Sequence, residues 1–253
     1  MSGYQFAFLM WRIESLMLLV IFHFIGELIV PKGSASLSRY GSGYFAFALI
    51  GVGFARYFDL TLKMFSESIR TAQATGCLEA MICTQTGCIP IILMSSLYGL
   101  ISGGVQLLMI LIGGVVLFHV SLSQMTIAPT ILVLILSIAI FMGFGVLSAA
   151  AIIWLKKGDP ITWILGGFGS ILGGAYFPIG VMPHWMQNIS FLIPVRYSLD
   201  ALRLTMLKGA PFSAVRQPTI TLAVMTAILL PASVAIFAGA VRKGRREGTL
   251  MQY

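Results

Sequence analysis

The sequence predicts an all-α integral membrane protein with six transmembrane helices. Of its 253 residues, 58% are hydrophobic and only 9% are charged, and the mean hydropathy is +0.96, which excludes a soluble domain with a wetted surface. Several apolar runs of about 18 or more residues are long enough to cross a hydrocarbon core of about 30 Å as helices. The runs are continuously apolar and do not alternate, so a membrane β-barrel is excluded.

The chain is expected to form a single transmembrane domain over residues 1–253, with an N-terminal interfacial helix before the first span. Residues 3–14 are apolar but end in Arg12 and Glu14, which indicates a helix lying in the membrane interface or a longer, tilted first helix. No basic residue precedes Arg12 and no small-residue cleavage site follows, so we expect the N-terminus to be retained. The expected spans cover residues 15–31, 44–62, 89–118, 128–154, 160–178 and 219–241.

The distribution of basic residues predicts that both termini are cytoplasmic. Of the 16 Lys and Arg residues, nine then fall on the cytoplasmic side, six fall on the opposite side, and Arg56 stays unassigned near a helix end. The basic tail at residues 242–246 is expected to anchor the topology against anionic lipid headgroups. The net charge of +8 therefore requires no nucleic-acid partner.

A polar stretch at residues 63–86 lies between two apolar runs and predicts a cytoplasmic loop, about residues 63–88, that docks a soluble partner. Charged side chains in this loop can form charge-assisted hydrogen bonds with a partner's cleft. An ordinary solvated loop is the alternative. Free reduced thiols are expected at Cys77, Cys83 and Cys88. The candidate coupling residues are Glu67, Arg70, Gly76, Cys77, Leu78 and Glu79.

The segment at residues 179–216 is expected to form short re-entrant helices that cap the outer end of a pathway. Pro178, Pro183 and Pro194 each remove a backbone donor and break helical continuity. Arg196 and Arg203 are expected to pair with Asp200 or with anionic headgroups of cargo, and a structural lid that never touches cargo is the alternative. The candidate gate residues are Phe177, Pro178, Pro183, Trp185, Pro194, Arg196, Tyr197 and Arg203.

Residue patterns for catalysis or metal binding are scarce. The sequence contains no G-x-S-x-G, H-E-x-x-H or G-x-x-x-x-G-K-[ST] motif, so we expect neither an enzyme nor a cofactor bound by this chain. His23, His119 and His184 lie far apart, and no metal site is expected. His23 and Glu27 are four residues apart on the first span, which suggests either a polar vestibule or a proton relay. Glycine pairs four residues apart, in spans three and five, predict close helix packing within the chain or at a dimer interface.

Two elements resemble type-2 ATP-binding-cassette permeases. Gly76-Cys77-Leu78-Glu79 is similar to the Gly-Thr-Leu-Glu element of their loop between spans two and three, with Cys in place of Thr. Tyr176-Phe177-Pro178, Met182-Pro183-His184-Trp185 and Pro194-Val195-Arg196-Tyr197 resemble the segment after span five. The departures are Met182 for Leu, Ile193 for Asn and Arg196 for a small or polar residue. The resemblance covers almost the whole chain.

This resemblance implies the permease subunit of an exporter for drugs, lipids or polysaccharides in a prokaryotic cytoplasmic (inner) membrane. It implies pairing with a second permease subunit, as a homodimer or with a similar subunit, and with two copies of a cytoplasmic subunit that binds ATP and Mg²⁺ and hydrolyses the ATP. ATP-driven closure would reach the bundle through residues 63–86 and the N-terminal interfacial helix. An ion-coupled secondary transporter and a non-transporting membrane scaffold are the alternatives.

Overall fold

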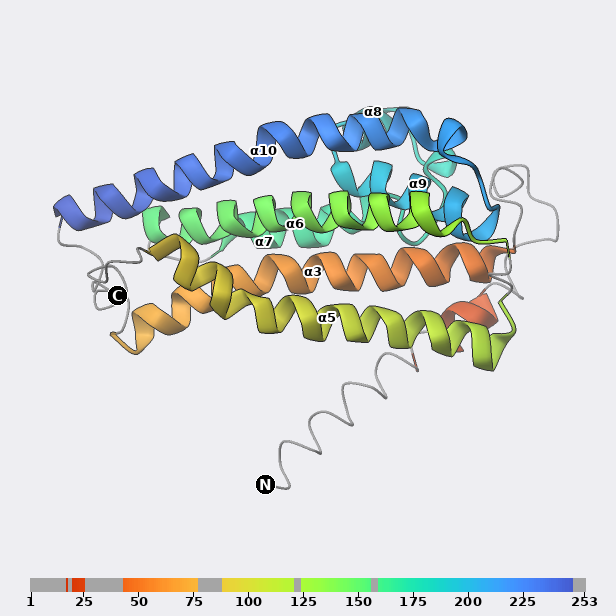
Figure 1. Ribbon diagram of the computed structural model, residues 1–253, viewed down its shortest axis with the longest axis horizontal. Helices are drawn as coiled ribbons and strands as arrows, with labels where there is room; N and C mark the ends of the chain where they lie inside the picture. Colours follow the sequence, from red (N-terminus) through yellow and green to blue (C-terminus); the bar gives the residue numbers. More distant parts are fainter. Residues whose placement is uncertain are drawn as a thin grey trace, which may run out of the picture.

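The computed structural model describes residues 17, 20–25, 43–76, 88–120, 124–155 and 159–247. Within these ranges every regular element is a helix, in agreement with the predicted all-α protein. Four of these helices are long and apolar enough to cross a membrane. They lie side by side as the body of the molecule (Figure 1). They are α3 (Tyr44–Ala74), α5 (Cys88–Phe118), α6 (Ile127–Leu155) and α10 (Phe212–Glu247).

Helix α3 is the central element of the bundle. In its most apolar 18-residue stretch 72% of the residues are buried, against 22% for α5 and for α10. Figure 1 shows α3 between α5 on one side and α6 and α7 on the other. Large apolar side chains fix this position, because Phe47, Phe54 and Phe58 are all fully buried. The Phe58 ring lies 4.6 Å from the Phe141 ring of α6, centroid to centroid.

The helix that contains the second expected span does not end near residue 62 but continues without a break to Ala74. Residues 63–74 contain no glycine or proline, and Phe65, Ile69 and Ala72 recur at helical spacing. These three side chains are buried in an apolar cluster that includes Ala149 of α6 and Phe237 of α10. Half of the expected loop is therefore a packed helix whose other face is polar.

The helix within the fifth expected span, residues 160–178, is shorter than that span. Helix α7 (Pro160–Leu172) has 13 residues, about 20 Å at 1.5 Å per residue, which is less than the core of a bilayer. It ends at Gly173 and Gly174, and Gly174 has a φ of +75°, which side chains with a Cβ rarely adopt. The chain then leaves the helix axis before Pro178.

Short helices follow α7, as the three prolines predicted. They are η1 (Ile179–Val181), α8 (His184–Ser190) and α9 (Pro194–Leu207). Pro178 and Pro183 directly precede η1 and α8, and Pro194 is the first residue of α9. An N–H at that position has no hydrogen-bond partner within the helix, so proline removes no helical bond there. The last helix, α10, begins at Phe212, earlier than the expected residue 219.

Arg203 of α9 joins three segments that are distant in sequence. It is 3% exposed, and its guanidinium donates hydrogen bonds to the carbonyl oxygens of Phe47 (3.2 Å), Gly174 (2.9 Å) and Ala175 (3.0 Å). A Cβ at Gly51 would collide with this guanidinium and with the Ala175 carbonyl, so α3 needs glycine there. The expected contact of Arg203 with cargo headgroups conflicts with this placement, because the guanidinium is buried against the backbone.

The expected first span is described only in part. Residues 20–25 are helical, and the Phe22 ring stacks on Tyr176 with 5.8 Å between centroids. The His23 ring lies among aromatic rings, 5.2 Å from Phe45 and 4.7 Å from Phe118. The expected interfacial helix at residues 3–14, Glu27 and most of the span at residues 15–31 lie outside the described residues.

The glycine pairs serve close packing within the chain. Gly99 and Gly103 bring α5 against Met64 and Tyr57 of α3, and a Cβ at Gly103 would lie 3.3 Å from the Tyr57 ring. On α7, a Cβ at Gly169 would lie 3.2 Å from the Phe58 ring of α3. Helix backbones therefore approach closely here because these positions lack side chains.

Candidate functional site

Three ionisable side chains of α3 form a charged stripe within an otherwise apolar span. Arg56, Asp59 and Lys63 are three and four residues apart, a spacing that places them next to one another on the helix surface. Lys63 Nζ donates a hydrogen bond to Asp59 Oδ2 at 2.8 Å, and the two groups form an ion pair. Asp59 is the middle residue of the 31-residue helix. The Asp59 and Lys63 side chains are 34% and 51% exposed, so the pair is accessible on a helix that is long and apolar enough to cross a membrane. Charged groups on such helices are rare, which makes this stripe a candidate functional site.

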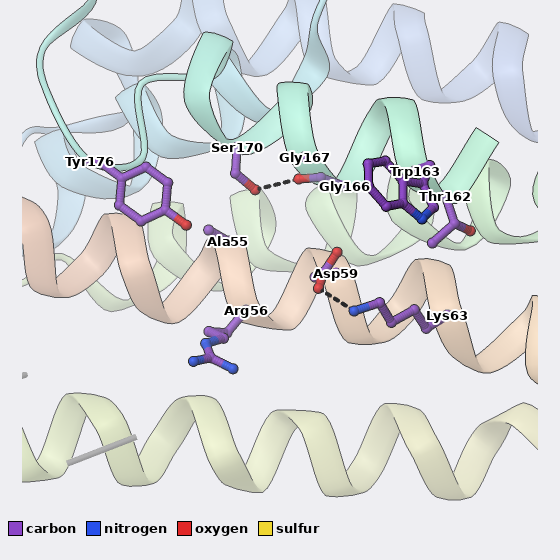
Figure 2. A pocket seen from close by; sticks show the side chains of 10 residues that line it. All are labelled: Ala55, Arg56, Asp59, Lys63, Thr162, Trp163, Gly166, Gly167, Ser170 and Tyr176. Atoms are coloured by element: carbon purple, nitrogen blue, oxygen red, sulfur yellow. Dashed lines mark hydrogen bonds and ion pairs between the residues drawn. The ribbon is translucent and has the colours of Figure 1, made fainter. Parts of the chain in front are cut away.

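A cavity of about 430 Å³ lies between this stripe and α7. Figure 2 shows the side chains around it, with Asp59 between the two helices and the Tyr176 hydroxyl at one end. Helix α7 supplies hydroxyl groups, an indole ring and two glycines to the opposite wall. The lining residues are Ala55, Arg56, Asp59, Lys63, Thr162, Trp163, Gly166, Gly167, Ser170 and Tyr176.

The two glycines of α7 make room for the cavity in different ways. A Cβ at Gly166 would lie 2.5 Å from Asp59 Oδ1, so the carboxylate occupies the space that a side chain would need. A Cβ at Gly167 would meet no atom within 4 Å, so this position faces the open cavity. The sequence Gly-Gly thus lets a charged group of α3 approach the backbone of α7.

The cavity joins a polar interior to an apolar rim. Arg56, Asp59 and Lys63 bring charged groups of both signs to the lining. Trp163, which also lines the cavity, is 84% exposed on the outer surface of α7, where Ile164 and Phe168 are exposed as well. A molecule with an anionic or polar head and an apolar body matches both surfaces.

A hydrogen-bonded corner holds the start of α7 against α6. Ser148 Oγ donates to Asp159 Oδ1 at 2.7 Å and lies 2.8 Å from Thr162 Oγ1, while the Thr162 N–H donates to Asp159 Oδ1 at 3.0 Å. Burial acts to raise the pKa of the Asp159 carboxyl, but the hydrogen bonds from Thr162 and Ser148 outweigh it and hold the pKa below its usual value. The ionised carboxylate therefore caps α7 and positions Thr162 in the cavity wall.

Some of the predicted coupling residues lie in the last turns of α3, and the others follow the end of this helix. Glu67 and Arg70 lie on exposed positions of its last turns, beyond the charged stripe. Gly76 follows the helix with a φ of +70°, and its N–H donates to the Gln73 carbonyl, a left-handed helix terminus that favours glycine. Cys77, Leu78 and Glu79 lie outside the described residues.

The predicted gate residues do not form one cluster. Arg196 and Tyr197 gather around Phe191: the Arg196 Cζ lies 3.9 Å from the Phe191 ring centroid, and the Tyr197 hydroxyl donates to the Phe191 carbonyl at 2.9 Å. Trp185 on α8 is 64% exposed, and Phe177 is also exposed. Arg203 is separated from them by its burial against α3. The prolines define helix starts and bring no polar group to a common site.

Sequence reasoning missed the charged stripe. The sequence interpretation places Arg56 near a helix end and Lys63 in a loop, and it gives Asp59 no role. The signal that reveals them is the spacing of three charged residues along one helical face, combined with continuation of the helix past residue 62. Among the residues that the structure describes, no three His, Cys, Asp or Glu side chains gather as metal ligands.

Comparison of the sequence with protein-family models gave no match, and comparison with curated proteins gave none either. The function is therefore inferred from the site and the arrangement of the helices.

Proposed function

We propose that the chain is the permease subunit of an ATP-binding-cassette exporter, and that it moves an amphipathic or lipid-like substrate across a prokaryotic cytoplasmic membrane. The observation that carries this proposal is the charged cavity between α3 and α7, because a polar cavity inside an apolar bundle offers a route for the polar part of a cargo. Separate ATP-hydrolysing subunits supply the energy, and a second copy of the chain completes the pathway.

In this proposal the cargo divides between two environments. Its polar head enters the cavity and contacts Arg56, Lys63 and the hydroxyl groups of α7, while its apolar part stays beside the exposed surface around Trp163. The head thereby avoids the hydrocarbon core, which is the main barrier to crossing. When cargo is absent, the ion pair between Lys63 and Asp59 lets the two charges partly neutralise each other.

Helix α3 provides a direct mechanical link between the cavity and an ATPase. Arg70, on the exposed face of the last turns, is 11 residues from Asp59, about 16 Å along an unbroken helix. A partner that pushes on Glu67 and Arg70 therefore also moves the charged stripe. Residues 63–74 of the expected coupling loop thus belong to the same helix as the charged stripe.

The proposal also retains the six-span arrangement with both termini in the cytoplasm. The region of residues 20–25 belongs to the first span, and α7 together with residues 173–178 forms the fifth. Helices α8 and α9 lie toward the end of the molecule where α3 begins (Figure 1), which suits short helices that dip into the outer leaflet. Arg203 holds them there as a structural brace.

A second candidate function is supported by one specific observation. Asp59 is a carboxylate at the middle of a helix that can span the membrane, and such groups carry protons or ions in secondary transporters. This candidate needs no ATPase. The two functions therefore differ in the energy source that drives movement of the cargo.

The two candidates can be separated in inverted membrane vesicles that contain the full chain and its proposed ATPase. A fluorescent amphipathic dye is offered outside, and its uptake is followed after adding ATP or after imposing a proton gradient. ATP-driven uptake that survives collapse of the gradient and is lost in Arg56→Gln supports the proposed exporter. Uptake driven by the gradient without ATP, and lost in Asp59→Asn, would replace it with the second candidate.

A further inference from the structure

A second groove, of about 440 Å³, lies between α6 and α10 at the end of the bundle where both helices finish. Four small residues from the two helices leave it open, and a Cβ at Gly239 would meet no atom within 4 Å. Apart from one lysine, its walls are apolar. The nine lining residues are Leu147, Ala150, Ala151, Trp154, Ile161, Ile236, Gly239, Ala240 and Lys243.

The charged residue of the groove lies at its rim. Lys243 Nζ is 5.3 Å from the centroid of the Trp154 ring, and both side chains come from the last turns of their helices. Tryptophan is favoured at the level of lipid headgroups, where an amphipathic ring meets both water and hydrocarbon. Lysine near the same level attracts anionic headgroups. The pair thus marks the boundary between headgroup and hydrocarbon on this face.

The groove extends from this rim into the apolar part of the bundle. From Lys243 back to Ile236 is seven residues, about 10 Å along α10. Ile236 is 52% exposed, so the groove opens to the surface of the bundle at this end. Among the described lining residues, one cation stands at the rim and apolar side chains form the rest of the groove, which complements an amphiphile with a negatively charged head.

We propose that this groove binds one anionic phospholipid of the surrounding membrane, with its phosphate at Lys243 and an acyl chain between α6 and α10. The positive charge of Lys243 selects an anionic headgroup over a zwitterionic one. A second copy of the chain is a poorer occupant, because it would have to cover an exposed lysine with an apolar surface. The proposal does not depend on the exporter function.

The test uses the full-length chain in phosphatidylcholine vesicles, with Trp154 as the only tryptophan after Trp11, Trp163 and Trp185 are changed to Phe. Phosphatidylglycerol with brominated acyl chains quenches tryptophan fluorescence on contact, and brominated phosphatidylcholine at equal mole fraction is the reference. We expect the anionic lipid to bind about fivefold more tightly, the effect of one basic residue near the headgroups.

Three variants locate the site. Lys243→Gln should remove the preference for the anionic lipid, whereas Arg242→Gln, which changes the neighbouring exposed residue outside the groove, should retain it. Gly239→Leu places a side chain in the open groove and should reduce quenching by both lipids. Leucine has a higher helix propensity than glycine, so α10 should keep its structure. Monodisperse elution of each variant shows that it is folded.

Several results would overturn the proposal. Equal quenching by the two lipids in the parent protein would show that Lys243 selects no headgroup. Equal losses of preference in Lys243→Gln and Arg242→Gln would indicate general attraction to a basic surface. Unchanged quenching in Gly239→Leu would place the acyl chain elsewhere. A lack of quenching by either lipid would show that protein, and not lipid, covers the groove.

Discussion

The Arg203 Cζ atom lies 3.4 Å from the centroid of the Phe47 ring, and Arg203 Nε donates a hydrogen bond to the Phe47 carbonyl oxygen at 3.2 Å. One side chain of α9 therefore contacts both the ring and the backbone of the same residue on α3. The planar guanidinium can make these contacts together with two further hydrogen bonds, whereas a lysine ammonium has neither the fork geometry nor the stacking surface.

Arg203→Lys is accordingly predicted to destabilise the protein, although the charge is kept. The change removes at least one hydrogen bond from a charged donor and leaves a buried carbonyl oxygen unsatisfied, at a cost of about 1.5–3 kcal/mol per bond. The thermal midpoint in detergent should fall clearly. Arg196→Lys is the control, since Arg196 is only half-buried and its hydrogen bond to Gln187 is long, at 3.4 Å. Equal midpoints for the two variants would contradict the role of Arg203 as a brace.

The adjacent glycines of α7 give a matched pair for testing the cavity. Gly166→Ala places a Cβ 2.5 Å from Asp59 Oδ1, which forces the carboxylate to move, at a cost of about 1–3 kcal/mol for overpacking. Dye transport should fall, together with a modest loss of thermal stability. Gly167→Ala meets open space and improves helix propensity, so stability should stay the same or rise by up to about 1 kcal/mol. Transport that is normal in Gly166→Ala would remove Asp59 from the pathway.

The pH dependence of stability tests the corner at Asp159. Its pKa is lower in the folded chain than its ordinary value of 3.8, because the hydrogen bonds from Thr162 and Ser148 outweigh the effect of burial. The carboxylate therefore contributes stability above that value, and the contribution is lost as the pH falls through the folded-state pKa. The thermal midpoint of the native chain should approach that of Asp159→Asn on acidification. Parallel midpoint curves for the two proteins would show that the corner is not stabilised by the ionised form.

The long helices could be predicted because continuous apolar runs specify them directly. The expected spans at residues 89–118 and 128–154 agree with α5 and α6 within one residue at each end. The end of α3 could not be read in the same way, because Phe65, Ile69 and Ala72 alternate with polar residues that lower the local hydropathy. Helical periodicity, and not average hydropathy, contains that information.

The charged cavity depends on tertiary contacts that sequence spacing does not provide. Arg56, Asp59 and Lys63 can be placed on one helical face from their spacing, but their apposition to Gly166 and Gly167 depends on how α7 packs against α3. The burial of the Arg203 side chain could not be predicted for a similar reason. Its acceptors are carbonyl oxygens at Phe47, Gly174 and Ala175, and no sequence motif marks a backbone carbonyl as a partner.

Co-elution of an active ATPase with the detergent-solubilised chain, isolated under mild conditions from cells that produce it natively, tests the proposed ATP-driven export most directly. The account predicts that a soluble ATPase co-elutes with the chain, that the complex hydrolyses ATP, and that an amphipathic dye changes the rate. Arg70→Glu, an exposed change at the end of α3, should lose the ATPase at an unchanged thermal midpoint, while Arg216→Glu near the start of α10 should retain it. A chain that elutes without an ATPase and, once reconstituted in vesicles, moves the dye in response to a proton gradient alone would contradict the account.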